Sequence, residues 1–149
     1  MNRLTYAAIA TGVLTSVFAL GRVSAHTLPT ATLPGSIIEH DSLVAVRQPG
    51  PHRGGGETTA YSFFAKVHGL PLVFRKRALH PGSAIGYHQQ REDEIYYVLS
   101  GTGELTLDDT LHVIGPGTAV LTRPGSSHSL RQTGASDLVI LIAYPAEKD

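Results

Sequence analysis

82-GSAIGYHQQREDEIYYVLSG-101 is the stretch of sequence that decides the fold of this chain. Successive side chains of a β-strand point to opposite faces, so His88 and Gln90 share one face while Arg91 points away from it. Glu94 follows a polar kink and begins a run of β-branched and aromatic residues that predicts the next strand. We expect a hairpin at the kink to bring Glu94 back beside His88.

A second stretch, 117-GTAVLTRPGSSH-128, ends in another histidine. The turn residues before it end one strand and let the chain re-enter the sheet, so His128 can face the same interior as His88. Together with Gln90 and Glu94, the two histidines offer imidazole nitrogens, an amide oxygen and a carboxylate. Donors of these kinds suit a borderline divalent transition metal.

These two stretches resemble the two sequence motifs of the cupin superfamily. The first motif has a glycine, five residues, His-x-His, three or four residues, a glutamate, six residues and a glycine. The second has a glycine, five residues, Pro-x-Gly, two residues and a histidine. Two positions depart from the pattern, because Gln90 stands in the place of the second histidine and Arg123 in the place of the proline. The matching positions are Gly82, His88, Gln90, Glu94 and Gly101 in the first motif and Gly117, Gly125 and His128 in the second.

The resemblance implies an all-β fold, a double-stranded β-helix or jelly-roll barrel, whose core covers about residues 72–144. It also implies one divalent transition-metal ion, either zinc, manganese, nickel, copper or iron, held by His88, Gln90, Glu94 and His128. Gln90 is the unusual member, because a neutral amide oxygen is a weaker ligand than imidazole. Either it ligates the metal and leaves one position easily exchanged, or it only hydrogen-bonds a bound water, or the site has decayed.

The rest of the chain predicts short strands separated by turns rich in glycine, which is typical of a sandwich, barrel or jelly roll. No long helix is expected. The segment 48–56 contains four glycines and two prolines. It is either a loop that borders the barrel mouth or a plain connector. The strand-like runs are 43–47, 58–67, 72–79, 95–100, 104–107, 111–114, 118–122, 129–132 and 138–144.

Glu94 and Tyr96 are the candidate catalytic residues. They share strand parity with Val98 and should face the pocket, whereas Tyr97 and Leu99 should face outward. Glu94 either ligates the metal or moves protons, and Tyr96 either positions a substrate or acts as an acid. The alternative for Tyr96 is a packing residue with a satisfied hydroxyl group.

Arg75 and Arg77 share one face of a predicted strand. On that face they could hold a substrate carboxylate. The simpler interpretation is a solvated edge strand, whose charges protect the sheet from aggregation.

The composition narrows the function further. A length of 149 residues with 42% hydrophobic content fits one globular domain with a substantial core. The 12 basic and 12 acidic residues leave no net charge, so neither nucleic acid nor an anionic membrane is expected as a partner. Cysteine is absent, so any metal must be held by nitrogen and oxygen.

The first 25 residues predict a signal peptide. Asn2 and Arg3 give a short positive start, residues 4–20 are mostly apolar, and Val23-Ser24-Ala25 supplies the small residues that a signal peptidase reads. We expect cleavage after Ala25, a single mature domain over 26–149, no membrane association afterwards, and a periplasmic or secreted protein. The alternative is an uncleaved anchor, for which this stretch is short.

The resemblance implies a mononuclear metalloenzyme of the isomerase, lyase or dioxygenase type that acts on a small oxygen-rich substrate such as a sugar acid or an enediol. The alternative is a non-catalytic periplasmic protein that binds a small sugar-like ligand or a metal. The third alternative is an inert structural protein that binds no stoichiometric metal. The outward apolar residues Ile95, Tyr97 and Leu99 would permit a homodimer.

Overall fold

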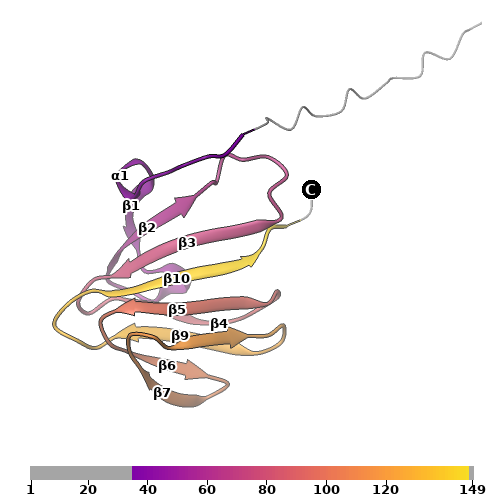
Figure 1. Ribbon diagram of the computed structural model, residues 1–149. Coiled ribbons are helices and arrows are strands. Elements are labelled where there is room, and N and C mark those ends of the chain that lie inside the picture. The colour runs from indigo at the N-terminus through magenta and orange to yellow at the C-terminus, as the bar shows by residue number, and fades with distance from the viewer. Residues whose placement is uncertain (1–34, 148–149) are drawn as a thin grey trace, which may run out of the picture. The chain divides into compact units, whose positions relative to one another are not determined.

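The computed structural model describes residues 35–147, which form two antiparallel β-sheets (Figure 1). Two short helical segments precede the third strand, α1 (Asp41–Val44) and a 3₁₀ turn (Pro51–Arg53). The all-β jelly-roll prediction is confirmed. The six-stranded sheet runs in the order β1 (Ala45–Pro49), β2 (Glu57–Phe63), β3 (Leu72–Leu79), β10 (Leu138–Pro145), β5 (Glu94–Ser100) and β8 (Ala119–Thr122). The four-stranded sheet runs in the order β4 (Ala84–Gln89), β9 (Ser127–Gln132), β6 (Gly103–Leu107) and β7 (Thr110–Ile114).

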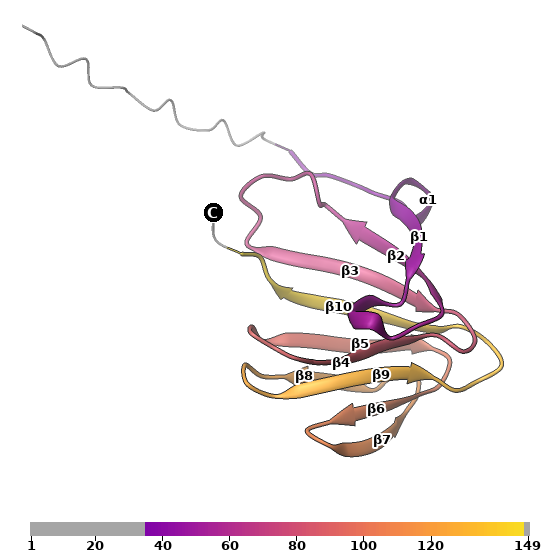
Figure 2. The same cartoon turned by 180° about the vertical axis from the view of Figure 1, so that it is seen from behind.

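Both sheets contribute apolar side chains to one core. The turned view in Figure 2 shows β4 and β9 side by side, with β6 and β7 following β9 in the same sheet. Leucine, isoleucine and valine at alternate strand positions fill the space, because one face of each sheet is buried and the other is solvated. The buried cluster consists of Leu79, Ile85, Tyr96, Val98, Leu105, Ile114, Leu130, Leu138, Ile140 and Ile142.

Most predicted strands are confirmed to within a residue or two, and the differences have local causes. The first strand begins at Ala45 because the preceding four residues form a helical turn, in which the side chain of His40 accepts a hydrogen bond from the backbone of Ser42. The second strand ends at Phe63 because Phe64 has a φ of 58°, which breaks the extended conformation.

The predicted hairpin between His88 and Glu94 is wrong. β4 pairs with β9 in one sheet, whereas β5 pairs with β10 and β8 in the other. The polar kink is therefore a corner at which the chain passes between sheets. Glu94 still approaches His88, but across the barrel interior.

The interpretation of Arg75 and Arg77 as residues of a solvated edge strand is also wrong. Their strand, β3, lies between β2 and β10 and is hydrogen-bonded on both sides. Arg77 is only 5% exposed, which no surface role explains.

Residues 36–147 belong to one compact unit. Within the described residues, none of the helices has the length and apolar character needed to cross a lipid bilayer. The predicted signal peptide, its cleavage site after Ala25 and the domain start at residue 26 lie outside the described residues.

Candidate metal centre

His88 and His128 are cross-strand neighbours. The register of β4 and β9 pairs them directly, and their ring centroids lie 4.5 Å apart in an edge-on arrangement. Directly opposed residues on two antiparallel strands project to the same face, so both imidazoles point into the barrel. His128 is fully buried at 0% exposure, whereas His88 is half-buried at the cavity.

Glu94 reaches the two histidines from the opposite sheet. Burial alternates along β5, so Glu94, Tyr96 and Val98 point inward while the residues between them are exposed. This confirms the predicted parity. The Oε2 atom of Glu94 lies 3.4 Å from Nε2 of His128. One donor atom from each of His88, Glu94 and His128 lies within 4.8 Å of the other two.

An ion pair holds the corner that leads to Glu94. Nε of Arg123 lies 2.6 Å from a carboxylate oxygen of Asp93, and both side chains are exposed. Arg123 is the residue that stands in the place of the motif's proline. This chain therefore has an ion pair to Asp93 at the corner where the motif has a rigid proline.

The surroundings of both imidazoles suit metal binding. Nδ1 of His88 donates to the carbonyl oxygen of Gly86 at 2.8 Å, which leaves Nε2 as the free acceptor. Burial, and then the neighbouring His88 and His52, lowers the pKa of His128 to about 4. Neutral histidine binds metal without first losing a proton at physiological pH.

Glu94 and Tyr96 have unusual proton affinities. Burial raises the pKa of Glu94, although hydrogen bonds from Tyr96 and Gln90 act in the opposite direction. Burial and the adjacent Glu94 raise the pKa of Tyr96 well above its usual range, so its hydroxyl remains a donor. That hydroxyl lies 3.0 Å from Nε2 of His128. Glu94 is thus a member of the group of possible metal ligands, and Tyr96 lies next to that group. Their catalytic roles stay predictions.

Gln90 directs its amide at Glu94. Nε2 of Gln90 donates a hydrogen bond to Oε2 of Glu94. A side chain in this position orients the carboxylate, as outer partners of metal ligands commonly do. Direct ligation by Gln90 stays a prediction, but the residue lies at the cluster, as its place in the motif implies.

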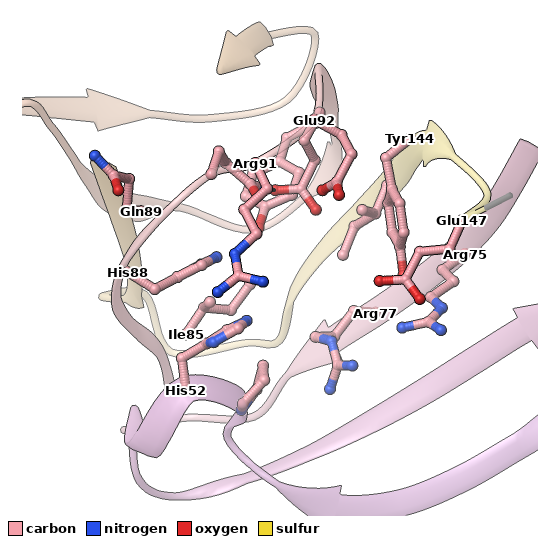
Figure 3. Close-up of a pocket in the computed structure, with 15 residues that line it drawn as sticks. His52, Arg75, Arg77, Ile85, His88, Gln89, Arg91, Glu92, Tyr144 and Glu147 are labelled. Atoms are coloured by element: carbon pink, nitrogen blue, oxygen red, sulfur yellow. Dashed lines mark hydrogen bonds between the residues drawn. The ribbon is translucent and has the colours of Figure 1, made fainter. Parts of the chain in front are cut away.

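His88 and Glu94 of the cluster line one wall of a cavity of about 450 Å³, whereas the fully buried His128 is not among its lining residues (Figure 3). Arg75 and Arg77 of β3 lie on the other wall, and both were candidates from the sequence. Nη1 of Arg77 donates to Oγ1 of Thr58 at 2.8 Å, and burial followed by the proximity of Arg75 lowers the pKa of Arg77. Neither guanidinium forms an ion pair within the part of the chain that the structure describes.

Several residues of the cavity wall escaped sequence reasoning, among them His52, Arg91 and the acidic Glu92 and Glu147. His52 lies flat against His88, and its segment, 48–56, does border the barrel mouth. Arg91 was expected to point away but lines the cavity, with its guanidinium toward His88 and His52 in Figure 3. Its strand ends at Gln89, so the alternation that placed Arg91 outside no longer applies. A histidine in a loop flanked by glycines was the available signal for His52.

Comparison with known proteins gives the family of this chain. The sequence model of the cupin domain family matches residues 76–144. An oxalate-binding protein of Thermotoga maritima is 31% identical over 110 residues, which are 72% of this chain and 91% of that protein. This chain belongs to the cupin family. The resemblance of the two motifs is therefore confirmed despite their two departures.

Solved structures share the cupin fold and extend the likeness to the barrel as a whole. A predicted oxalate decarboxylase from T. maritima superimposes with a TM-score of 0.67 at 30% identity, covering 74% of this chain and all of the other. A putative sugar phosphate isomerase from Acidithiobacillus ferrooxidans gives 0.57 at 26% identity, covering 64% and 62%. The polyketide cyclase RemF from Streptomyces resistomycificus gives 0.64 at 24% identity, covering 76% and 81%, and shows the fold alone.

The donors of this cupin fit a transition metal. Two ligands bound at about 2.1 Å in a tetrahedral arrangement lie roughly 3.4 Å apart. The separation of 3.4 Å between Glu94 and His128 agrees with that distance. Two imidazoles and one carboxylate form a set that suits zinc, manganese, nickel, copper or iron, and a three-ligand set leaves positions for an exogenous molecule.

Proposed function

We propose that this cupin binds one divalent transition-metal ion through His88, Glu94 and His128, and that it holds a small carboxylate-bearing molecule between this ion and the arginines of β3. The observation that carries the proposal is the pairing of two walls in one cavity. One wall offers metal ligands, and the other offers two cations that form no ion pair among the described residues.

The two arginines favour an anionic ligand over a neutral sugar. Nε of Arg75 is buried and has no hydrogen-bond partner among the described residues. A buried polar atom without a partner is costly, and a bound carboxylate would remove that cost with a charge-assisted hydrogen bond. The name of the T. maritima oxalate-binding protein supports the same class of ligand. A cavity of about 450 Å³ has room for a small acid or sugar acid.

The proposed chemistry assigns separate tasks to the residues of the site. A metal at the cluster would act as a Lewis acid toward ligand oxygens. Glu94 would give that ion its one anionic protein donor. Tyr96 supplies a hydrogen-bond donor next to the cluster, and the arginines orient the ligand. Isomerase, lyase and dioxygenase reactions all use such an arrangement.

The second candidate is binding without turnover. The T. maritima relative that is 31% identical is named for binding oxalate, which favours a protein that captures a small acid. The same cavity and the same residues serve both candidates. Only a measurement of turnover separates them.

Export is part of the proposal. Residues 1–25 have the composition of a cleaved signal peptide, so we place the mature protein in the periplasm or outside the cell. Mass spectrometry of the protein from a periplasmic fraction should give a chain that begins at His26. A chain that retains residues 1–25 in the membrane fraction would contradict this part of the proposal.

The test of function begins with untagged protein purified from the periplasm. Elemental analysis should find about one transition-metal ion per chain, and calorimetry should show that the loaded protein binds oxalate or a sugar acid better than a neutral sugar. His128→Ala should abolish both, whereas the exposed His112→Ala should change neither. Absence of metal after reconstitution would refute the proposal. Turnover of the acids, with metal-free protein as control, then separates enzyme from binder.

A further inference from the structure

The metal centre of the proposed function has a neighbour that supplies none of its ligands. The ring of His52 lies parallel to the ring of His88, with an interplanar angle of 5° and a centroid separation of 3.5 Å. Figure 3 shows the two rings stacked at the edge of the cavity. His52 does not belong to the group of residues whose donor atoms lie within 4.8 Å of one another.

Three contacts together define the orientation of His88. His52 covers one face of its ring, His128 meets it edge-on at 4.5 Å, and the carbonyl oxygen of Gly86 accepts from Nδ1. The last two come from the sheet itself. The first is the only one of the three that a loop delivers, so it can be removed without touching a strand.

Glycines let the backbone of the loop that carries His52, segment 48–56, lie directly against the backbone of β4, with no side chain between them. A Cβ atom on Gly50 or Gly54 would clash with the carbonyl oxygen of Ala84, and a Cβ on Gly86 would clash with that of His52. A backbone hydrogen bond of 3.2 Å from the amide of Ala84 to Gly55 ties the loop down. The close approach brings His52 over His88, and it depends on glycine at both contacting segments.

The backbone at His52 is in an unfavourable conformation. His52 has φ 52° and ψ 33°, and Arg53 has a φ of 61°, so two consecutive residues other than glycine lie in the left-handed region. This costs roughly 1–2 kcal/mol for a residue with a side chain. The ring of His52 is exposed on its far side, so burial of apolar area does not explain why the conformation is kept. Strain of this kind is typical of sites where a side chain must be held in place.

We propose that His52 is a positioning residue for the metal centre: its ring, lying flat on His88, holds that imidazole with Nε2 toward Glu94 and His128. The inference rests on the proposed metal site. His52 acts through the flat face of its ring, so an aromatic ring without nitrogen can replace it. A residue that contacted the metal or its ligand through nitrogen could not be replaced in this way.

The test compares Co²⁺ binding by the full chain and its variants. Affinity is measured by competition with a chelator, and the ligand-field spectrum of Co²⁺ reports the geometry of the site. His52→Ala should weaken binding about 10- to 100-fold, the range typical of lost outer-shell partners, and should change the spectrum. His52→Phe should restore both to within a few-fold of the parent protein, and His112→Ala is the exposed control. Thermal melts should show that all variants are folded.

Each result separates the inference from the function on which it rests. If the parent protein fails to bind Co²⁺, the proposed metal site is wrong, and the inference with it. If the parent binds and His52→Ala binds equally well with the same spectrum, the metal site stands and His52 has no positioning role. If His52→Phe is as weak as His52→Ala, a nitrogen of His52 is needed, which also overturns the inference. Gly54→Ala, whose Cβ atom would clash with the carbonyl oxygen of Ala84 and displace the loop, should reproduce the spectrum of His52→Ala.

Discussion

Replacing Arg77 by methionine separates its role in ligand binding from its role in the fold. Methionine keeps most of the length of the side chain and removes the charge. If Arg77 holds a carboxylate, the variant should lose affinity for the acid while the barrel stays as stable as before. If Arg77 only stabilises the fold, the variant should lose stability and keep its affinity for the acid.

The expected loss of affinity follows from the lost hydrogen bonds. A hydrogen bond to a charged group is worth about 1.5–3 kcal/mol. Since each 1.4 kcal/mol is roughly tenfold in affinity, Arg77→Met should weaken acid binding about 10- to 150-fold. Metal content should not change, because Arg77 is not among the clustered donors.

The expected change in stability is small because two effects oppose each other. Thr58 loses the bond of 2.8 Å from Arg77, but its hydroxyl still donates to the carbonyl oxygen of Gln48 at 3.2 Å. Against this loss, the variant no longer buries a cation that has no ion pair among the described residues. We therefore expect the free energy of unfolding to change by no more than about 2 kcal/mol, within the range of one hydrogen bond to a charged group.

Calorimetry with oxalate on metal-loaded protein measures the affinity, and urea denaturation of the same samples measures stability. Arg47→Met is the matched control, because Arg47 is an exposed arginine of β1 paired with Glu57 at 3.1 Å. It should change neither quantity. A loss of stability above about 2 kcal/mol with less than a twofold change in affinity would refute the assignment of Arg77 to the ligand.

Three further predictions concern the metal cluster and the core. Gln90→His should tighten metal binding about tenfold, the lower end of the effects seen when residues around a bound metal are changed. An unchanged metal affinity in competition with a chelator would show that Gln90 is no ligand. Glu94→Gln should lower the metal content of purified protein well below one ion per chain and abolish any turnover; elemental analysis that still finds a full ion would remove Glu94 from the ligand set. Leu130→Ala should lower the free energy of unfolding by about 2–5 kcal/mol in urea, because this side chain is 0% exposed in the core. A smaller loss would mean that the neighbouring strands close the cavity.

The strands and the group of possible metal ligands could be predicted because the residue patterns that indicate them are local in the sequence. Alternation along Glu94, Tyr96 and Val98 specifies which side chains enter the barrel, and a period of two leaves no other choice once one face is buried. The spacing of the two motifs then brings His88 and His128 into register. Sequence reasoning failed at the corner between the sheets, since a hairpin and a crossover have the same turn residues.

The second wall of the cavity could not be predicted, because it depends on contacts between distant segments. Arg77 reads as a surface residue until β2 and β10 are known to flank its strand. His52 acquires a neighbour only when two glycine-containing backbones meet, and no periodicity records such a contact. What escaped prediction is the strained conformation of His52 and the burial of Arg77, each of which is unfavourable by itself. Local rules fail where a protein gives up stability for a task. The burial of Arg77 fits the binding of an anionic ligand, and the strain at His52 fits a role in positioning His88.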